Sequence, residues 1–454
     1  MLYSSAAEIL ELYQNPNVRK IFSPSFYKKD RKEQEELIKG VPQFAKKGVN
    51  IDTILDTSRN YYFFSVDFLS NELADHVHNR VITKQDEDGG FPLVDRDYLL
   101  EIRGKEFEEA IDNYLKSYKD TFNKVYQRDV QDFKQVLVPT YWTNYIVLLL
   151  LSKWKTCVEQ DSHPSISYPL DKIVSAIKKG KEWLEDNSLD SGFPFSHKSI
   201  SNTPNTYDTC MALIALNYTT SYDNDIQDGG FSGKEHLEAL LRTDIRNANG
   251  SWKKEPGIDK EDTGATAYAT QTLLKYYRRE NDDKERDRYL PFIENGVKWL
   301  IDNQRKKEDG GWGEFGQQQS QESFVEKTCY ALMALAKYQT TFFKYSVTEE
   351  PIDAGLSFLN ERKRPYKPYS IGFVWPNDYE MGKAPEEWKD SLKNSSLAIS
   401  AMLRCGVKGH DVVVQKGIIG TSRFYEKTHE ENSNAWYNPI YYFCMLADFL
   451  KRVQ

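Results

Sequence analysis

The sequence repeats itself about every 60 residues, a period that indicates a repeat architecture before any single residue is interpreted. Each copy has a glycine-containing loop that ends in an aromatic residue, followed by a run rich in Thr, Ala and Leu. An earlier copy, DGGF, ends at Phe91, and a degenerate one lies at Trp436. The four clearest copies are SGFPF, ANGSW, GGWGEF and IGFVW, whose aromatic residues are Phe193, Trp252, Trp312 and Phe373.

Two kinds of helix flank these loops. Residues 287–304 carry apolar side chains at helical spacing on one face, which predicts an amphipathic helix. Residues 322–341 carry apolar or small side chains on most faces, which predicts a buried helix. The same pair of helices, joined by a loop, can be laid over the chain six times.

These pairs predict an all-α fold, an (α/α)6 toroid in which two concentric rings of helices close on themselves. The amphipathic helices are expected at 58–82, 170–187, 233–246, 287–304, 350–364 and 411–427. The buried helices are expected at 138–154, 205–222, 259–280, 322–341, 389–406 and 434–453. In domain terms, we expect a helical N-terminal extension over 1–57 and a barrel over 58–454, with a helical insertion at about 95–137.

Composition excludes several classes of protein. The formal net charge of -8 and a pI near 5.6, with basic and acidic residues interspersed, argue against a nucleic-acid-binding surface. The longest apolar stretch, 145–151, is too short to span a membrane, and the N-terminus does not resemble a signal peptide. Five cysteines without CxxC spacing are typical of a reducing compartment, so we expect a cytoplasmic protein.

One copy of the repeat points to a known family. WLIDNQRKKEDGGWGEF followed by TCYALMALA resembles the QW-type repeat of the squalene-hopene cyclase and prenyltransferase superfamily, over roughly residues 170–454. The resemblance implies an (α/α)6 barrel. It leaves three functions open: class II terpene cyclase, protein prenyltransferase β subunit, or a toroid without either activity. In all three, the loop glycines and aromatic residues are expected to be structural.

In this superfamily the N-terminal ends of the inner helices face the mouth of the cavity. Comparing those ends requires an alignment of the six inner helices, which we set on Thr143, Thr209, Thr263, Thr328, Ser395 and Pro439. With this alignment, the third inner helix stands apart because three carboxylates, Asp259, Glu261 and Asp262, precede it within four residues.

This cluster resembles the DxDD motif of class II terpene cyclases, with glutamate in place of the central aspartate. The resemblance implies that Glu261 protonates an alkene while Asp259 and Asp262 orient its proton. Neighbouring carboxylates can keep one acid neutral, because like charges at short distance cannot all ionise. Capping is the structural alternative: Asp259 and Asp262 have the spacing of a helix-capping pair, and a first-turn acid is favoured by the helix dipole.

Aromatic residues near the starts of the inner helices are candidates to line a substrate pocket and stabilise carbocations. They are Tyr141, Trp142, Tyr207, Trp436, Tyr437 and Tyr441. The expected ligand is an isoprenoid or another apolar small molecule. No metal site is predicted, and Mg²⁺ is expected only if the substrate carries a diphosphate. The second hypothesis is a non-catalytic toroid that binds a lipid-like ligand or a protein partner.

The prenyltransferase hypothesis depends on zinc. The resemblance implies that an Asp-x-Cys pair at one inner helix and a His on the next hold the metal. Asp208 and Cys210 have this spacing, but the corresponding residue of the next helix is Asp262 and no inner helix contains a histidine. Cys210 is therefore expected to be a small buried residue.

Overall fold

The computed structural model describes fourteen stretches of the chain. They are residues 29–40, 66–85, 87–91, 141–159, 170–189, 192–194, 204–219, 233–258, 260–316, 322–366, 372–378, 390–409, 411–431 and 438–450. The proposed insertion at 95–137 lies outside them, and of the extension over 1–57 they contain only 29–40, with helix α4 (Arg31–Lys39). The division into domains therefore stays a prediction.

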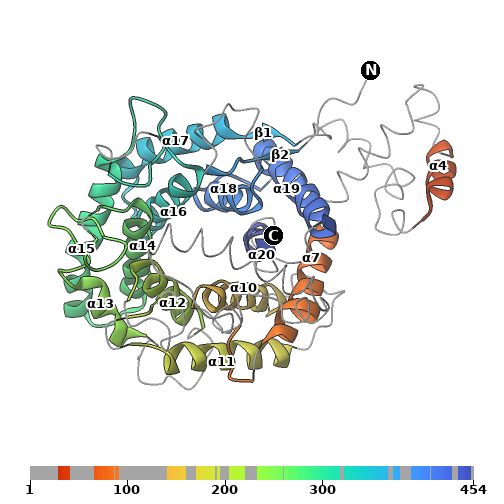
Figure 1. Ribbon diagram of the computed structural model, residues 1–454. Coiled ribbons are helices and arrows are strands. Elements are labelled where there is room, and N and C mark those ends of the chain that lie inside the picture. Colours follow the sequence, from red (N-terminus) through yellow and green to blue (C-terminus); the bar gives the residue numbers. More distant parts are fainter. Residues whose placement is uncertain are drawn as a thin grey trace, which may run out of the picture.

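Six helices form a closed inner ring in which each contacts its two neighbours, and α20 returns to α10 (Figure 1). They are α10 (Tyr141–Glu159), α12 (Thr206–Thr219), α14 (Thr263–Arg279), α16 (Val325–Phe342), α18 (Leu392–Arg404) and α20 (Asn438–Leu450). Side chains are buried around most of each helix, as the small and apolar residues predict. The toroid fold is confirmed, and each inner helix lies within its expected range or within five residues of it.

An outer ring surrounds the inner one (Figure 1). It contains α7 (Val66–Asp75), extended by a π-helical turn His76–Val81 and a 3₁₀ turn Ile82–Lys84, then α11 (Leu170–Asp186), α13 (Leu237–Leu241), α15 (Asp283–Asp302), α17 (Tyr345–Arg362) and α19 (Val412–Glu431). The third member is shorter than the expected 233–246 because the chain leaves the helix at Arg242 and Arg246 then bridges to Trp252. A two-residue antiparallel pair, β1 (Arg364–Pro365) with β2 (Phe373–Val374), adds strand to the predicted all-helical fold.

The repeated loop aromatic joins three parts of each hairpin. The backbone N–H of Trp312 donates to the Thr328 hydroxyl of the following inner helix at 3.0 Å. Its indole N–H donates to the carbonyl of Leu300 on the preceding outer helix at 2.7 Å. Trp252 repeats both bonds, to Thr266 and Leu240. Because the indole is completely buried, it fills the space between the two rings and fixes each loop against both.

These contacts correct the alignment of two copies. In the fifth copy the residue that makes them is Trp375, which donates to Ser395 and to the carbonyl of Leu359, and not Phe373. In the third copy the hydroxyl belongs to Thr266, three residues after the Thr263 used for the alignment. The third inner helix must therefore be compared with the others after a shift of three residues.

Glycine is required where the loops pass close to the outer helices. Gly310 has φ +78°, and a Cβ there would lie 2.7 Å from the carbonyl oxygen of Ala354. On the next residue of that helix, Gly355, a Cβ would lie 2.8 Å from the indole of Trp312. The two glycines thus allow the loop and its tryptophan to reach the helix backbone. No helix within the described stretches is long and apolar enough to cross a membrane.

Candidate functional site

The carboxylates before the third inner helix do not mark it as different from the others. Asp262 is the N-cap residue of α14 and accepts the backbone N–H of Ala265 at 2.8 Å. With the register set by Thr266, it corresponds to Asn205, which accepts the N–H groups of Tyr207 and Asp208 at the start of α12. Asp262 is therefore itself the cap of α14, whereas the expected pair made Asp259 the cap and placed Asp262 in the first turn.

The proposed proton donor lies in the loop before this cap. Glu261 is partly exposed, accepts a hydrogen bond from the Asn249 side chain and lies beside Gly316. Asp259 lies outside the described residues. The described part of the cluster therefore places one carboxylate in a helix cap and the other in a loop, each with a different hydrogen-bond partner.

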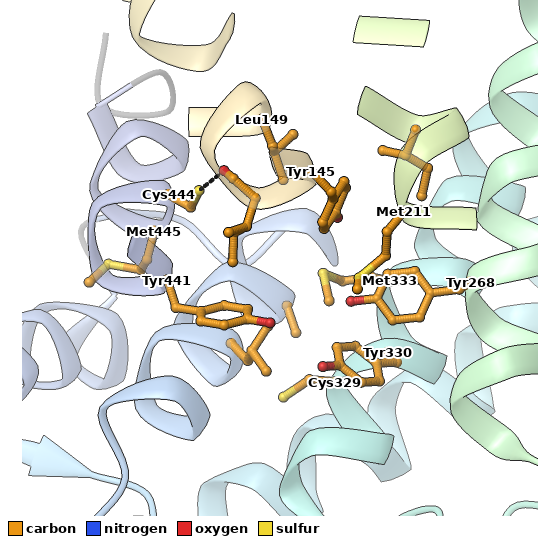
Figure 2. Close-up of a cluster of buried hydrophobic side chains, with 14 of the residues drawn as sticks. Tyr145, Leu149, Met211, Tyr268, Cys329, Tyr330, Met333, Tyr441, Cys444 and Met445 are labelled. Carbon is orange, nitrogen blue, oxygen red and sulfur yellow. Dashed lines mark hydrogen bonds between the residues drawn. The ribbon is translucent and has the colours of Figure 1, made fainter. Parts of the chain in front are cut away.

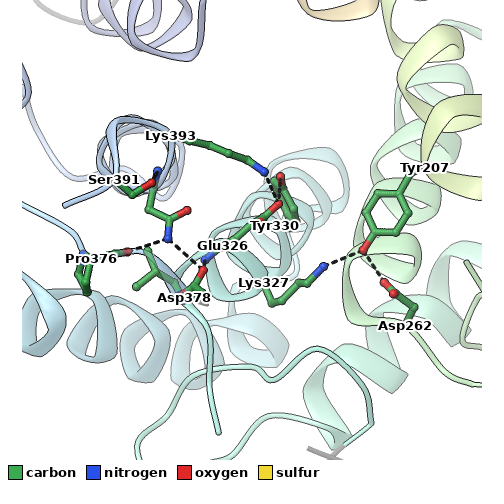
Figure 3. A network of polar contacts seen from close by, with 11 residues as sticks. Tyr207, Asp262, Glu326, Lys327, Tyr330, Pro376, Asp378, Ser391 and Lys393 are labelled. Atoms are coloured by element: carbon green, nitrogen blue, oxygen red, sulfur yellow. Dashed lines mark hydrogen bonds and ion pairs between the residues drawn. The ribbon is translucent and has the colours of Figure 1, made fainter. Parts of the chain in front are cut away.

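A polar network instead connects the first turns of the inner helices (Figure 3). The Tyr207 hydroxyl donates to Asp262 at 2.5 Å and accepts from the Lys327 ammonium at 3.0 Å. The tyrosine is on α12 and the lysine on α16, so the contact reaches across α14. The predicted role of Tyr207 in lining a substrate pocket stays a prediction, and the sequence did not predict its contact with Lys327.

A second part of the network is centred on Glu326, at the start of α16. Its carboxylate accepts from the Lys393 ammonium at 2.8 Å and from the Tyr330 hydroxyl at 2.6 Å. Burial alone would raise the pKa of Glu326, but the ammonium groups of Lys393 and Lys327 outweigh it and lower the pKa to about 2. Glu326 is therefore ionised at neutral pH.

Asp378 supports this region from a distant loop. Its carboxylate accepts the backbone N–H groups of Val325 and Glu326, at 2.6 and 2.9 Å, and so caps α16. Asn394 of α18 donates to the same carboxylate at 3.0 Å. The cap of α16 is therefore a tertiary contact. Burial raises the pKa of Asp378 to about 6.

The pKa of Asp208 is shifted in the opposite direction to that of Glu326. It lies in the first turn of α12, is 2% exposed, and its Oδ2 has no hydrogen-bond partner among the described residues. Burial raises the pKa of Asp208 to about 8, only partly offset by the positive charge of Lys254. The carboxyl is therefore protonated at neutral pH, while that of Glu326, at the same level of the ring, is ionised.

Four tyrosines lie around the centre of the barrel, among leucine, methionine and cysteine side chains (Figure 2). Tyr145, Tyr268, Tyr330 and Tyr441 are all buried, and the rings of Tyr268 and Tyr330 lie 4.7 Å apart. All four stand two residues after the aligned position of their helix once α14 is aligned on Thr266. Only Tyr441 was predicted. Tyr141 and Trp142 lie in the first turn of α10 but their side chains are outside the description, as are Trp436 and Tyr437 altogether.

Beyond the tyrosines, toward the C-terminal ends of the inner helices, lies a cavity of about 60 Å³. Its wall includes Tyr145, Tyr268 and Tyr441 at one end and Lys153, Lys275 and Arg404 at the other. A water molecule needs about 10–15 Å³ on this scale, so the space holds a few waters. This volume is too small for a polyprenyl chain.

The residues of the proposed zinc site do not suit a metal. Cys210 is completely buried, and burial raises the pKa of its thiol well above the usual range. This is the small buried residue that the sequence predicted. Within the described stretches, no three His, Cys, Asp or Glu side chains are grouped as metal ligands would be. We therefore derive no step that uses a metal.

Comparison with known proteins gives relatives in structure alone. No family model and no curated protein matches the sequence. A sugar epimerase from a ruminal bacterium superposes with a TM-score of 0.58 at 10% identity, covering 85% of this chain and 98% of its own. Cellobiose 2-epimerase from Bacillus thermoamylovorans gives 0.56 at 11% identity, covering 85% and 100%. An unsaturated glucuronyl hydrolase specific for heparin gives 0.53 at 9% identity, covering 85% and 98%.

At these identities the likeness shows the fold and nothing more. The toroid predicted from the loop motifs is shared with two sugar epimerases and a glucuronyl hydrolase, which are not squalene-hopene cyclases.

Proposed function

We propose that the protein is a carbohydrate-active enzyme that cleaves a glycosidic bond by acid–base chemistry at the N-terminal ends of its inner helices. The observation that carries the proposal is the separation of two carboxyl pKa values there: about 8 for Asp208 and about 2 for Glu326. In glycosidases, one carboxyl group with a raised pKa serves as the proton donor, and a second with a low pKa stabilises charge as a carboxylate.

Each residue of the site has a role in this reaction. Asp208, protonated at neutral pH, donates its proton to the leaving oxygen as the glycosidic bond breaks, and Glu326 stabilises the positive charge that develops on the sugar. A water molecule then adds to the anomeric carbon and gives a proton back to the Asp208 carboxylate. The Lys327 ammonium donates one N–H group to Tyr207 and has two more that are suited to sugar hydroxyls. The sugar-related activities named for structures of the same fold agree with this class of substrate.

The geometry gives less support to cyclisation of a polyprenyl chain. That reaction needs a dry chamber with its acid in the wall. Glu261 is partly exposed in a loop, and buried tyrosines lie around the barrel centre. Protonation by Glu261 with Asp259 and Asp262, and with it an isoprenoid ligand, stays a prediction that the same experiment tests.

Asp208→Asn is expected to lower kcat on a responsive glycoside by about a hundredfold or more, because the variant cannot donate the proton. Glu261→Gln is the matched control, since it neutralises an acid 53 residues away in a loop that the mechanism does not use. Activity is measured as reducing sugar released from a panel of disaccharides and aryl glycosides, with nuclear magnetic resonance to detect epimers.

The same preparations are incubated with farnesyl and geranylgeranyl diphosphate and squalene, and products are separated by gas chromatography. If the wild type forms a cyclised product and Glu261→Gln does not, the terpene cyclase hypothesis is supported and our proposal is wrong. Full glycoside activity in Asp208→Asn would remove Asp208 as the acid. If neither panel is turned over, the non-catalytic toroid that binds a lipid-like ligand or a protein partner becomes the better hypothesis.

A further inference from the structure

Each inner helix carries one titratable side chain near its C-terminal end, nine or ten residues after its aligned position. We call this set the basal ring. It comprises Lys153 of α10, Tyr218 of α12, Lys275 of α14, Lys337 of α16, Arg404 of α18 and Asp448 of α20. Four of the six side chains are cationic and one is a carboxylate. The ring lies at the opposite end of the inner helices from the site proposed above.

The single carboxylate of the basal ring is shared. The Lys153 ammonium lies 2.6 Å from one oxygen of Asp448, and the Arg404 guanidinium lies 3.3 Å from the other. The Lys275 ammonium lies 3.4 Å from the centre of the Tyr218 ring. Burial lowers the pKa of Lys275, and its interaction with Tyr218 opposes that effect. All six side chains of the ring are partly exposed, and four of them are basic against one carboxylate. An anion among them would therefore be attracted by the excess of positive charge.

The cavity of about 60 Å³ provides the space for that anion. Five of the six basal-ring residues line it, all except Lys337. Gln271, Ser396 and Ser400 line it too and offer neutral hydrogen-bonding groups. Tyr145, Tyr268 and Tyr441 line its other end. At about 10–15 Å³ for each water, the cavity has room for a tetrahedral oxyanion or a carboxylate group.

We infer that the basal ring binds a small oxyanion, a phosphate, sulfate or carboxylate group, held by Lys275, Lys153 and Arg404. The anion is a free ion or the charged group of a small molecule that enters from the C-terminal end of the ring. Guanidinium and ammonium groups are the usual ligands of such anions. The site is independent of the proposed glycosidase chemistry, so either can fail without the other.

Titration of the site gives it a characteristic pH dependence. The Lys275 ammonium, helped by Arg404 and Lys153, lowers the pKa of Tyr218 to about 7 against the opposing effect of burial. Burial, together with the like charge of Lys275, lowers the pKa of Lys337 to about 8. Asp448 is the remaining charged group around the phenol, and Arg404 and Lys153 keep its pKa near 2. As pH rises through this range, a tyrosinate forms and an ammonium is lost, so anion binding weakens.

The test uses the full-length protein and sulfate, whose charge does not change in this range. At about pH 6, we expect saturating sodium sulfate to raise Tm by a few degrees relative to sodium chloride of equal ionic strength. The rise is expected to disappear in Lys275→Met. It is expected to persist in Lys298→Met, the control, because Lys298 is an exposed lysine of the outer helix α15.

A second readout does not require a variant that loses a buried charge. Sulfate is expected to raise the pKa of Tyr218, because the bound anion disfavours tyrosinate; Tyr218→Phe identifies its signal among the 29 tyrosines in an ultraviolet titration. At about pH 8 the wild type carries a tyrosinate at this position and Tyr218→Phe does not. We therefore expect sulfate to raise Tm more in Tyr218→Phe than in the wild type at that pH. No rise in Tm at about pH 6, or the same rise in wild type and Lys275→Met, would overturn the inference.

The source of the anion is distinguished by a second ligand. Glycerol 3-phosphate is compared with sulfate, and glycerol serves as the uncharged control. A larger Tm rise with the phosphate ester indicates that the site takes a charged group of a metabolite. An equal or smaller rise indicates a free ion.

Discussion

Replacing Trp375 by alanine is expected to lower the free energy of unfolding by about 3–5 kcal/mol, the usual cost of truncating a buried aromatic side chain to alanine. The indole is completely buried between the two rings of helices. Its backbone N–H donates to Ser395 at 2.9 Å and its indole N–H to Leu359 at 2.8 Å. The truncation leaves the Leu359 carbonyl without its side-chain donor and opens a cavity against Gly417 of α19.

Phe373, two residues earlier, provides a matched control. Its ring is partly exposed on β2, with the ammonium groups of Lys363 and Lys416 5.1 and 5.5 Å from its centre. We expect Phe373→Ala to cost about 1 kcal/mol or less, because little apolar surface leaves contact with protein. Urea unfolding of both variants, followed by circular dichroism, gives the comparison. Equal losses would mean that the aromatic position of the fifth copy has been assigned wrongly.

That pair of variants also marks where prediction from sequence fails. The helices of the toroid follow from apolar periodicity, so α15 (Asp283–Asp302) and α16 (Val325–Phe342) lie close to the expected 287–304 and 322–341. The loop of the fifth copy contains two aromatic residues, Phe373 and Trp375, with one residue between them. Composition cannot decide which of the two enters the core, because that depends on the contact with Ser395.

The candidate site failed for a related reason. The start of α14 offers three threonines, at 263, 266 and 270, and an alignment by residue type accepts any of them. Only the bond from Trp252 to Thr266 sets the register. An alignment on Thr263 instead places Asp262, a helix cap, and Glu261, a loop residue, among the residues that face the mouth of the barrel. This is why Glu261 became the favoured acid.

Other features of the site cannot be predicted from neighbouring residues in the sequence. Asp378 caps α16 from a loop more than fifty residues later, so no capping motif near Val325 predicts it. Asp208 was noticed only for its spacing to Cys210. Its electrostatics come from burial by neighbouring helices and loops, a tertiary effect. The tyrosine layer, by contrast, was readable: Tyr145, Tyr268 and Tyr330 share one position of the repeat once the register is correct.

Asp208→Asn is expected to stabilise the protein while it removes activity. The pKa of Asp208 is 3.8 without burial and about 8 in the fold. Between these values the unfolded chain ionises this carboxyl and the folded chain keeps it protonated, so the wild type loses stability as pH rises. Above about pH 8 the accumulated penalty is on the order of 6 kcal/mol, at 1.36 kcal/mol for each unit of pKa shift. Asparagine, which does not ionise, is free of it.

Denaturant unfolding of both proteins over about pH 4 to 9 measures this difference, with Asp287→Asn, an exposed aspartate of α15, as control. We expect the curves of wild type and Asp208→Asn to meet near pH 4 and to separate progressively up to about pH 8, while the control follows the wild type. Parallel curves would mean that Asp208 ionises normally in the fold. The carboxyl would then be anionic at neutral pH, and it could not serve as the proton donor.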